Sequence, residues 1–101
     1  MLNVITLVGR IVELPKEIKE GEEVIMIMSV PRSYKNENGE YETDIIPVNL
    51  IGGVAKNTLE YCKKGDLVGI KGRVQIKDFK ITIIAEKLTF LSTNKDLIEK
   101  D

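Results

Sequence analysis

The chain has 101 residues, of which 43% are hydrophobic and 31% charged, and its formal net charge is -1. This length fits one domain with one core, and the composition is typical of a soluble globular protein rather than a disordered one. No apolar run is long enough to span a membrane, and the N-terminus lacks a signal-peptide pattern. A single cysteine excludes an internal disulfide, which favours a reducing cytoplasm.

The residue types argue against catalysis. The chain contains no histidine, so it cannot build a Ser-His-Asp or Cys-His arrangement or a metal site with the usual Cys and His spacing. The glycine-rich phosphate-binding motifs are also missing. The acidic residues cluster in polar stretches that resemble solvated loops rather than acid-base pairs. We therefore expect a binding protein with no cofactor and no metal.

The first half of the chain predicts two strands. Residues 3–13 alternate with apolar side chains on both faces, which favours a strand covered by the core and by a neighbouring chain. Gly9 interrupts the pattern, as a bulge or a bend requires. Residues 14–23 read as a polar loop. The second strand is expected over residues 24–30. Pro31, which follows it, either ends the pairing or marks a sheet edge.

A hairpin and a third strand come next. Asn38-Gly39 between extended segments is a strong turn signal. From Asp44 onward the side chains alternate, which predicts a strand with one buried and one outward face. Ile46, Val48 and Leu50 form the buried face, and Ile45, Pro47, Asn49 and Ile51 form the outward face.

A short helix should follow the third strand. Apolar residues stand at helical spacing after Gly52-Gly53, from Val54 through Thr58 and Leu59 to Cys62. Lys63 and Lys64 are expected in the last turn, where they would suit the helix dipole, and Gly65 is expected to end it. Cys62 reads as a buried small hydrophobic residue rather than a reactive thiol.

Two further strands complete the pattern, over residues 68–77 and 80–91, with a tight turn at Asp78-Phe79. In the last strand Ile81, Ile83 and Ala85 are expected opposite Thr82, Ile84, Glu86, Leu88 and Phe90. The fourth strand carries a polar row on one face: Lys71, Arg73, Gln75 and Lys77. A row of cations can be an ordinary solvated face or a phosphate-binding surface. Residues 92–101 form a short polar tail.

Charge is unevenly distributed along the chain. This bears on whether the cation row is a solvated face or a phosphate-binding surface. Residues 13–44 hold nine acidic and four basic side chains, whereas residues 45–90 hold eight basic and four acidic ones. A nucleic-acid-binding face needs local positive potential, not a basic total. The second half of the chain can therefore supply such a face despite the net charge.

Four segments, in order, resemble the bacterial single-stranded DNA-binding protein family. The opening segment NVITLVGR, the stretch from Arg32-Ser33-Tyr34 to Asn38-Gly39-Glu40, the helix end EYCKKG and the strand VGIKGR each resemble the family's corresponding segment. The resemblance covers about residues 1–91. It implies an all-β fold, a five-stranded OB-fold Greek-key barrel with one short helix between the third and fourth strands. It also implies a homodimer or homotetramer.

The resemblance also implies a set of binding residues. OB-folds bind single strands with cations on the backbone and aromatic rings on the bases. Tyr34 and Phe79 fall where the family keeps stacking rings, whereas Ile45 and Ile51 stand at two such positions without a ring. The expected nucleic-acid-binding residues are Arg10, Arg32, Tyr34, Lys35, Ile45, Ile51, Lys71, Arg73, Lys77 and Phe79.

Two functions stay open at this stage. The first is binding of single-stranded DNA without sequence preference, in the cytoplasm at the nucleoid, during replication, recombination and repair. The second is an OB-fold protein-interaction module, such as a replication-restart, plasmid or phage accessory protein, with weak nucleic-acid affinity. Replication proteins are possible partners in either case. The family's long tail with an acidic tip is missing, which fits a tail-less relative or a shortened chain.

Overall fold

A computed structural model describes residues 1–21 and 23–93 of the chain. Its elements confirm the predicted order of five strands with one helix between the third and fourth. They are β1 (Ile5–Glu13), β2 (Val24–Lys35), β3 (Tyr41–Leu50), α1 (Gly52–Tyr61), β4 (Leu67–Lys77) and β5 (Lys80–Ser92). Most of the expected tail, residues 94–101, lies outside the described residues.

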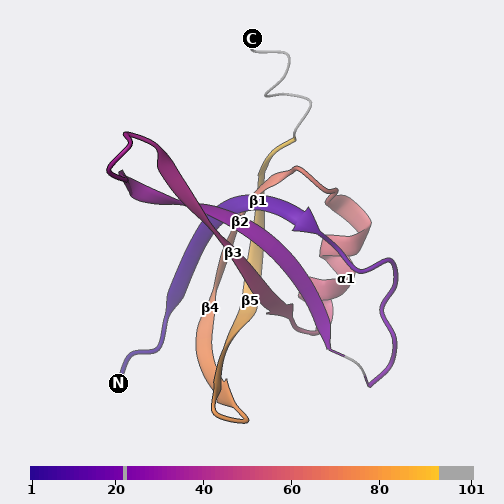
Figure 1. Ribbon diagram of the computed structural model, residues 1–101. Coiled ribbons are helices and arrows are strands. Elements are labelled where there is room, and N and C mark those ends of the chain that lie inside the picture. The colour runs from indigo at the N-terminus through magenta and orange to yellow at the C-terminus, as the bar shows by residue number, and fades with distance from the viewer. Residues whose placement is uncertain (22, 94–101) are drawn as a thin grey trace.

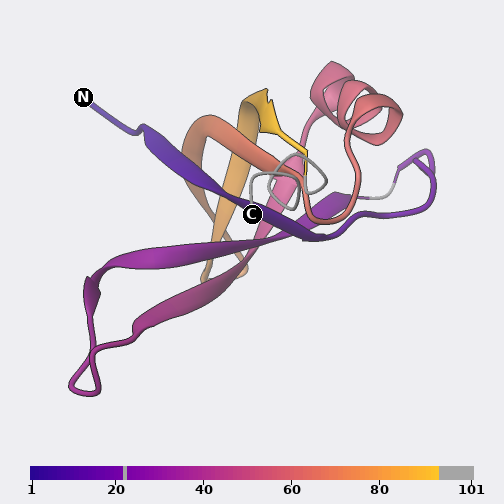
Figure 2. The same ribbon diagram turned by 90° about the horizontal axis from the view of Figure 1, so that it is seen from above.

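The strands close into a barrel in the order β1-β2-β3-β5-β4, and β4 returns to pair with β1 (Figure 1). All neighbouring strands are antiparallel except β3 and β5, which are parallel over three residue pairs. This arrangement, with α1 between β3 and β4, is the predicted OB-fold Greek key. Two hairpins extend beyond the barrel: the distal part of β2 and β3, and the connected ends of β4 and β5 (Figures 1 and 2).

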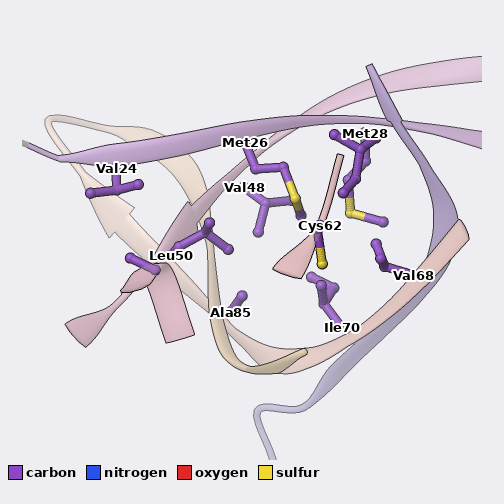
Figure 3. Packing of buried hydrophobic residues seen from close by; sticks show 11 residues of the cluster. Val24, Met26, Met28, Val48, Leu50, Cys62, Val68, Ile70 and Ala85 are labelled. Carbon is purple, nitrogen blue, oxygen red and sulfur yellow. The ribbon is translucent and has the colours of Figure 1, made fainter. Parts of the chain in front are cut away.

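The interior of the barrel is a single apolar core (Figure 3). Alternate residues of each strand point inward, so each strand supplies one face, as the period-two patterns predict. Ala55 and Thr58 of α1 and the following Cys62 are also buried. Burial raises the pKa of the Cys62 thiol, which agrees with its expected structural role. The buried strand residues are Ile11, Val24, Met26, Met28, Val48, Leu50, Val68, Ile70, Ile84 and Ala85.

Two glycines let strands approach closely. A Cβ on Gly9 would lie 2.3 Å from the carbonyl oxygen of Ser29, where β1 crosses β2. A Cβ on Gly72 would lie 1.7 Å from the carbonyl oxygen of Ile84, beside an irregularity between Lys71 and Gly72 in the β4–β5 pairing. Neither position has room for a side chain. A bulge or a bend was predicted at Gly9, but its pairing with Val68 is regular, and the irregularity of β1 lies between Ile11 and Glu13.

The predicted end of the second strand was wrong. β2 does not stop at Val30 but continues to Lys35, and Pro31 still pairs with Thr43 of β3. β1 pairs with β2 from Ser29, opposite Arg10, back toward the start of β2. The part of β2 that follows Val30 has no paired residue in β1. Pro31 therefore lies on a strand edge, where its missing N–H removes no hydrogen bond of the ladder. Residues 31–44, called the arm below, project from the barrel as a two-stranded ribbon (Figure 2).

Two further expectations need correction. Leu88 was expected on the face opposite Ala85. The irregularity near Gly72 reverses the alternation of β5 there, so Leu88 packs against the core on the same face as Ala85. The helix ends at Tyr61, so Lys63 and Lys64 lie beyond its last turn. There the backbone N–H of Lys63 donates to the buried carboxylate of Asp66 at 2.7 Å.

Candidate nucleic-acid interface

The outward face of β3 is an aliphatic strip with one amide. Ile45, Pro47, Asn49 and Ile51 follow each other along this face, and we call them the outer row. Ile25 and Ile27 of β2 pair with Asn49 and Pro47, so their side chains lie beside it. The outer row was predicted from the alternation, and Ile45 is indeed exposed.

A groove of about 430 Å³ separates the outer row from the β4–β5 hairpin. Its apolar surface comes from Ile25, Pro47 and Ile81, and Lys77 and Lys80 contribute two cations. An apolar surface beside positive charge can contact the bases and the phosphates of one strand at the same time. The remaining lining residues are Glu23, Asn49, Asp78 and Thr82.

The tip of the β4–β5 hairpin holds Phe79 in an unusual conformation. Asp78 and Phe79 connect the strands as the predicted tight turn, with positive φ angles of 51° and 64°. Such angles are typical of a two-residue hairpin turn but favour glycine, asparagine or aspartate. A phenylalanine there is strained, and its ring, 101% exposed, gains no packing in return. The turn thus holds an aromatic ring out in solvent next to the groove.

The arm carries three of the predicted residues. Tyr34 is exposed, and the Nζ of Lys35 lies 5.8 Å from the centre of the Tyr41 ring, a cation–π contact. Arg32 donates from Nε and Nη2 to the carboxylate of Asp44 at 3.1 and 2.9 Å, and its Nη1 lies 2.5 Å from Glu42. The hydrogen bonds to Arg32 lower the pKa of Asp44, while Asp44 and Glu42 raise that of Arg32.

Three other predicted cations, Arg10 of β1 and Lys71 and Arg73 of β4, lie on the side of the barrel, and we call this surface the wall. The Nη1 of Arg73 lies 2.6 Å from the carboxylate of Glu86 on β5. Lys71 stands opposite Lys87 of β5 and Thr6 of β1. Arg10 of β1 donates from Nη1 to the carbonyl oxygen of Gly65 at 3.0 Å.

The structure therefore divides the predicted site residues among several surfaces. Lys77 lines the groove, Phe79 projects from the hairpin that bounds it, and Ile45 belongs to the outer row that forms its other side. Ile51 ends that row and lines a separate cavity of about 330 Å³ beside Ile18. Arg32, Tyr34 and Lys35 belong to the arm, and Arg10, Lys71 and Arg73 to the wall.

Several groove residues were missed by the sequence reasoning. Pro47 and Asn49 share the alternation that selected Ile45 and Ile51, so that signal was available. Lys80 directly follows the hairpin turn, at the position that pairs with Lys77. Ile25 and Thr82 could not be chosen, because only the pairing of β2 with β3 and the closure of the barrel bring them to the groove.

Residues 1–21 and 23–93 offer neither a metal-binding cluster nor a helix that could span a membrane. No group of three or more Cys, Asp or Glu side chains is arranged there to hold a metal ion. Within the same residues no helix has the length and apolar character needed to cross a membrane.

Comparison with known proteins settles the family. Residues 2–90 match the model of the single-strand binding protein family. The chain belongs to this family. Single-stranded DNA-binding protein 1 of Clostridium acetobutylicum is 34% identical over 110 residues, covering 96% of this chain and 100% of the relative. Single-stranded DNA-binding protein B of Bacillus subtilis is 39% identical over 83 residues, covering 79% and 74%.

Solved structures agree on the fold. The small single-stranded DNA-binding protein of Streptomyces coelicolor superposes with a TM-score of 0.65 at 18% identity, covering 90% of this chain and 95% of that one. The second single-stranded DNA-binding protein of Mycobacterium smegmatis gives 0.62 at 19% identity, covering 87% of each chain. The resemblance noted from four short segments is thereby confirmed, and with it the predicted barrel.

Proposed function

We propose that this protein binds single-stranded DNA without sequence preference and protects it during replication, recombination and repair. The observation that carries the proposal is the groove beside the outer row, in a chain of the single-strand binding protein family. Its aliphatic surface contacts base faces, which all four bases share, and its lysines bind phosphates, which carry no sequence information. The reaction is binding, not catalysis, and it takes place in the cytoplasm at the nucleoid.

The remaining predicted residues extend this surface. Lys71 and Arg73 bind phosphates on the wall, and Tyr34 and Phe79 stack on bases from the two projecting hairpins. Arg32 and Lys35 help to bind the phosphates of the DNA strand along the arm. Arg10 does the same from the wall beside β4. Residues 1–91 form the DNA-binding domain, with 92–101 as its tail.

Fluorescence anisotropy with a labelled oligothymidine at two salt concentrations tests the proposal. Phosphate contacts release counterions, so the affinity should fall steeply with salt, and oligodeoxyadenosine should bind with the same salt slope. Arg73→Ala with Lys77→Ala should weaken binding to both and flatten the slope, by up to about 0.7 for each phosphate contact that is lost. An affinity that neither salt nor these substitutions change would contradict phosphate binding by this face.

The second candidate is a protein-interaction module, and one observation favours it. Ile45, Ile76 and Ile81 are exposed by 60%, 62% and 72%, and aliphatic side chains stack on bases less well than aromatic rings. Replication proteins are the partners expected for such a surface. If oligothymidine does not bind at low salt while the purified protein retains replication proteins from a defined mixture, this function replaces the first.

We also propose that the protein is a homo-oligomer, either a dimer or a tetramer. Val4, Val8 and Leu91 are exposed apolar side chains, and Val8 and Leu91 flank Gly69 on the outside of β1 and β4. A second copy that covers this face would bury them. Sedimentation at micromolar concentration should give the mass of two or four chains, whereas a monomer mass would contradict the proposal.

A further inference from the structure

One ion pair bridges the two sides of the groove. Glu23 precedes β2 and lies beside Asn49 of the outer row, while Lys77 ends β4 at the hairpin. Their side chains form a hydrogen-bonded ion pair across 54 residues of sequence. The contact lowers the pKa of the Glu23 carboxyl and raises that of the Lys77 ammonium, so both groups are charged at neutral pH.

The same kind of pairing recurs at the other predicted phosphate-binding residues. Across residues 1–21 and 23–93, the ion pairs join Lys77 to Glu23, Arg73 to Glu86, and Arg32 to Glu42 and Asp44. Every basic partner in these pairs is a residue that the sequence predicts to contact phosphate. A carboxylate offers such a cation what a phosphate diester offers, a negative charge and acceptor oxygens.

We propose that Glu23 holds Lys77 as an internal substitute for a DNA phosphate and thereby sets the affinity and the salt dependence of the groove. This inference rests on the proposed DNA-binding function. In the free protein the Glu23 carboxylate forms an ion pair with the Lys77 ammonium. When a strand enters, a phosphate oxygen takes that place, and the displaced carboxylate then lies close to the DNA backbone and repels it.

The exposure of the pair allows this exchange. The side chains of Lys77 and Glu23 are 57% and 46% exposed, so a phosphate can approach the pair from the solvent. Exposed ion pairs contribute little to folding stability, so an incoming phosphate can replace one without disturbing the barrel. A buried pair would instead have locked the lysine away from the strand.

Glu23→Gln tests the role of the carboxylate, because it keeps the shape and removes the charge. We expect oligothymidine to bind about three- to tenfold more tightly at low salt. The salt slope should steepen by up to about 0.7, the value of one phosphate contact on a single strand. Glu17→Gln is the matched control, since Glu17 lies in the same connection between β1 and β2, is exposed, and forms none of the ion pairs above.

The Lys77→Gln background shows whether Glu23 acts through Lys77. In that background Glu23→Gln should change neither affinity nor slope by more than Glu17→Gln does. Three outcomes overturn the inference while oligothymidine still binds: unchanged affinity in Glu23→Gln, an equal gain in Glu17→Gln, or a gain that persists without Lys77. Weaker binding by Glu23→Gln would show that the pair only fixes the hairpin. Failure of the parent protein to bind would instead refute the proposed function itself.

Discussion

The arm and the β4–β5 hairpin both project from the barrel and both carry an exposed aromatic ring, but their turns are built differently (Figure 1). In the arm the side chain of Asn36 accepts from the N–H groups of Asn38 and Glu40 at 2.9 and 3.0 Å. Gly39 takes the one positive φ angle of that turn, 77°. In the β4–β5 hairpin the positive angles fall on Asp78 and Phe79, and Phe79 has no such compensation.

The difference separates a stable turn from a strained one. The arm follows ordinary turn chemistry, and the Arg32 ion pairs join its two strands, so its sequence is explained by stability. Glycine would be the stable choice at position 79, and a fully exposed phenylalanine stands there instead. Strained residues are enriched at ligand-binding sites, which agrees with the stacking role proposed above for Phe79.

The largest expected effect is the loss of a ring at either hairpin. Phe79→Leu and Tyr34→Leu keep an apolar side chain but remove the stacking surface, and each should weaken oligothymidine binding by about 1–3 kcal/mol. Because the two residues lie on separate hairpins, the losses should add in the double variant. Titrations of the three variants measure this. An unaffected Tyr34→Leu would restrict the DNA contact to the groove side.

Restoring a ring at the base of the arm should act in the opposite direction. Ile45 pairs with Ser29 and is exposed, so Ile45→Trp can extend into solvent without overpacking the core. One productive stack would tighten binding by about 1–3 kcal/mol, and bound DNA should quench the new tryptophan.

Ile51→Phe is the comparison for that variant, because Ile51 lies at the far end of the outer row beside a different cavity. It should gain less than Ile45→Trp. A folded Ile45→Trp protein with neither tighter binding nor quenching would show that DNA does not follow the outer row.

Introducing a glycine in one turn should stabilise the protein, and removing a glycine from the other should destabilise it. Phe79→Gly removes the strain of a positive φ angle and should raise the free energy of unfolding by about 0.5–1 kcal/mol, after the entropy of glycine is counted. Gly39→Ala meets no steric clash but must adopt φ of 77°, so it should lower that free energy by about 1 kcal/mol. Urea denaturation measures both. Shifts of the same sign would remove the distinction drawn between the turns.

The smallest expected effect is an acid-induced opening of the arm. The pKa of Asp44 is depressed by Arg32, so the native state favours the ionised carboxylate. Its contribution is present above the usual value of 3.8 and is lost as the pH falls through the lower folded value. The protection factors of amides in the arm, taken relative to intrinsic exchange at the same pH, should therefore fall below about pH 4. Asp44→Asn should abolish this fall, whereas an equal fall in the paired part of β1 and β4, which none of the ion pairs above joins, would indicate general unfolding.

Much of the fold could be predicted from local patterns. The alternation in β3 assigned Val48 and Leu50 to the core and Ile45 to the outside, and the apolar stripe assigned Cys62 to the interior. The prediction failed where a strand departs from regular geometry. The irregularity near Gly72 moved Leu88 inward, and an unpaired edge allowed β2 to continue past Pro31.

The sequence by itself determined the order of elements, because hydrophobic period and turn residues are local properties of the chain. The resemblance of four ordered segments to one family supplied the barrel topology and the family. Only the tertiary structure decided which residues meet. It brought Ile25, Pro47 and Lys80 to one groove and paired Lys77 with Glu23, Arg73 with Glu86, and Arg32 with Glu42 and Asp44. Contacts such as that of Glu23 with Lys77 depend on strand register and barrel closure, which here join positions 54 residues apart and leave no local signal in the sequence.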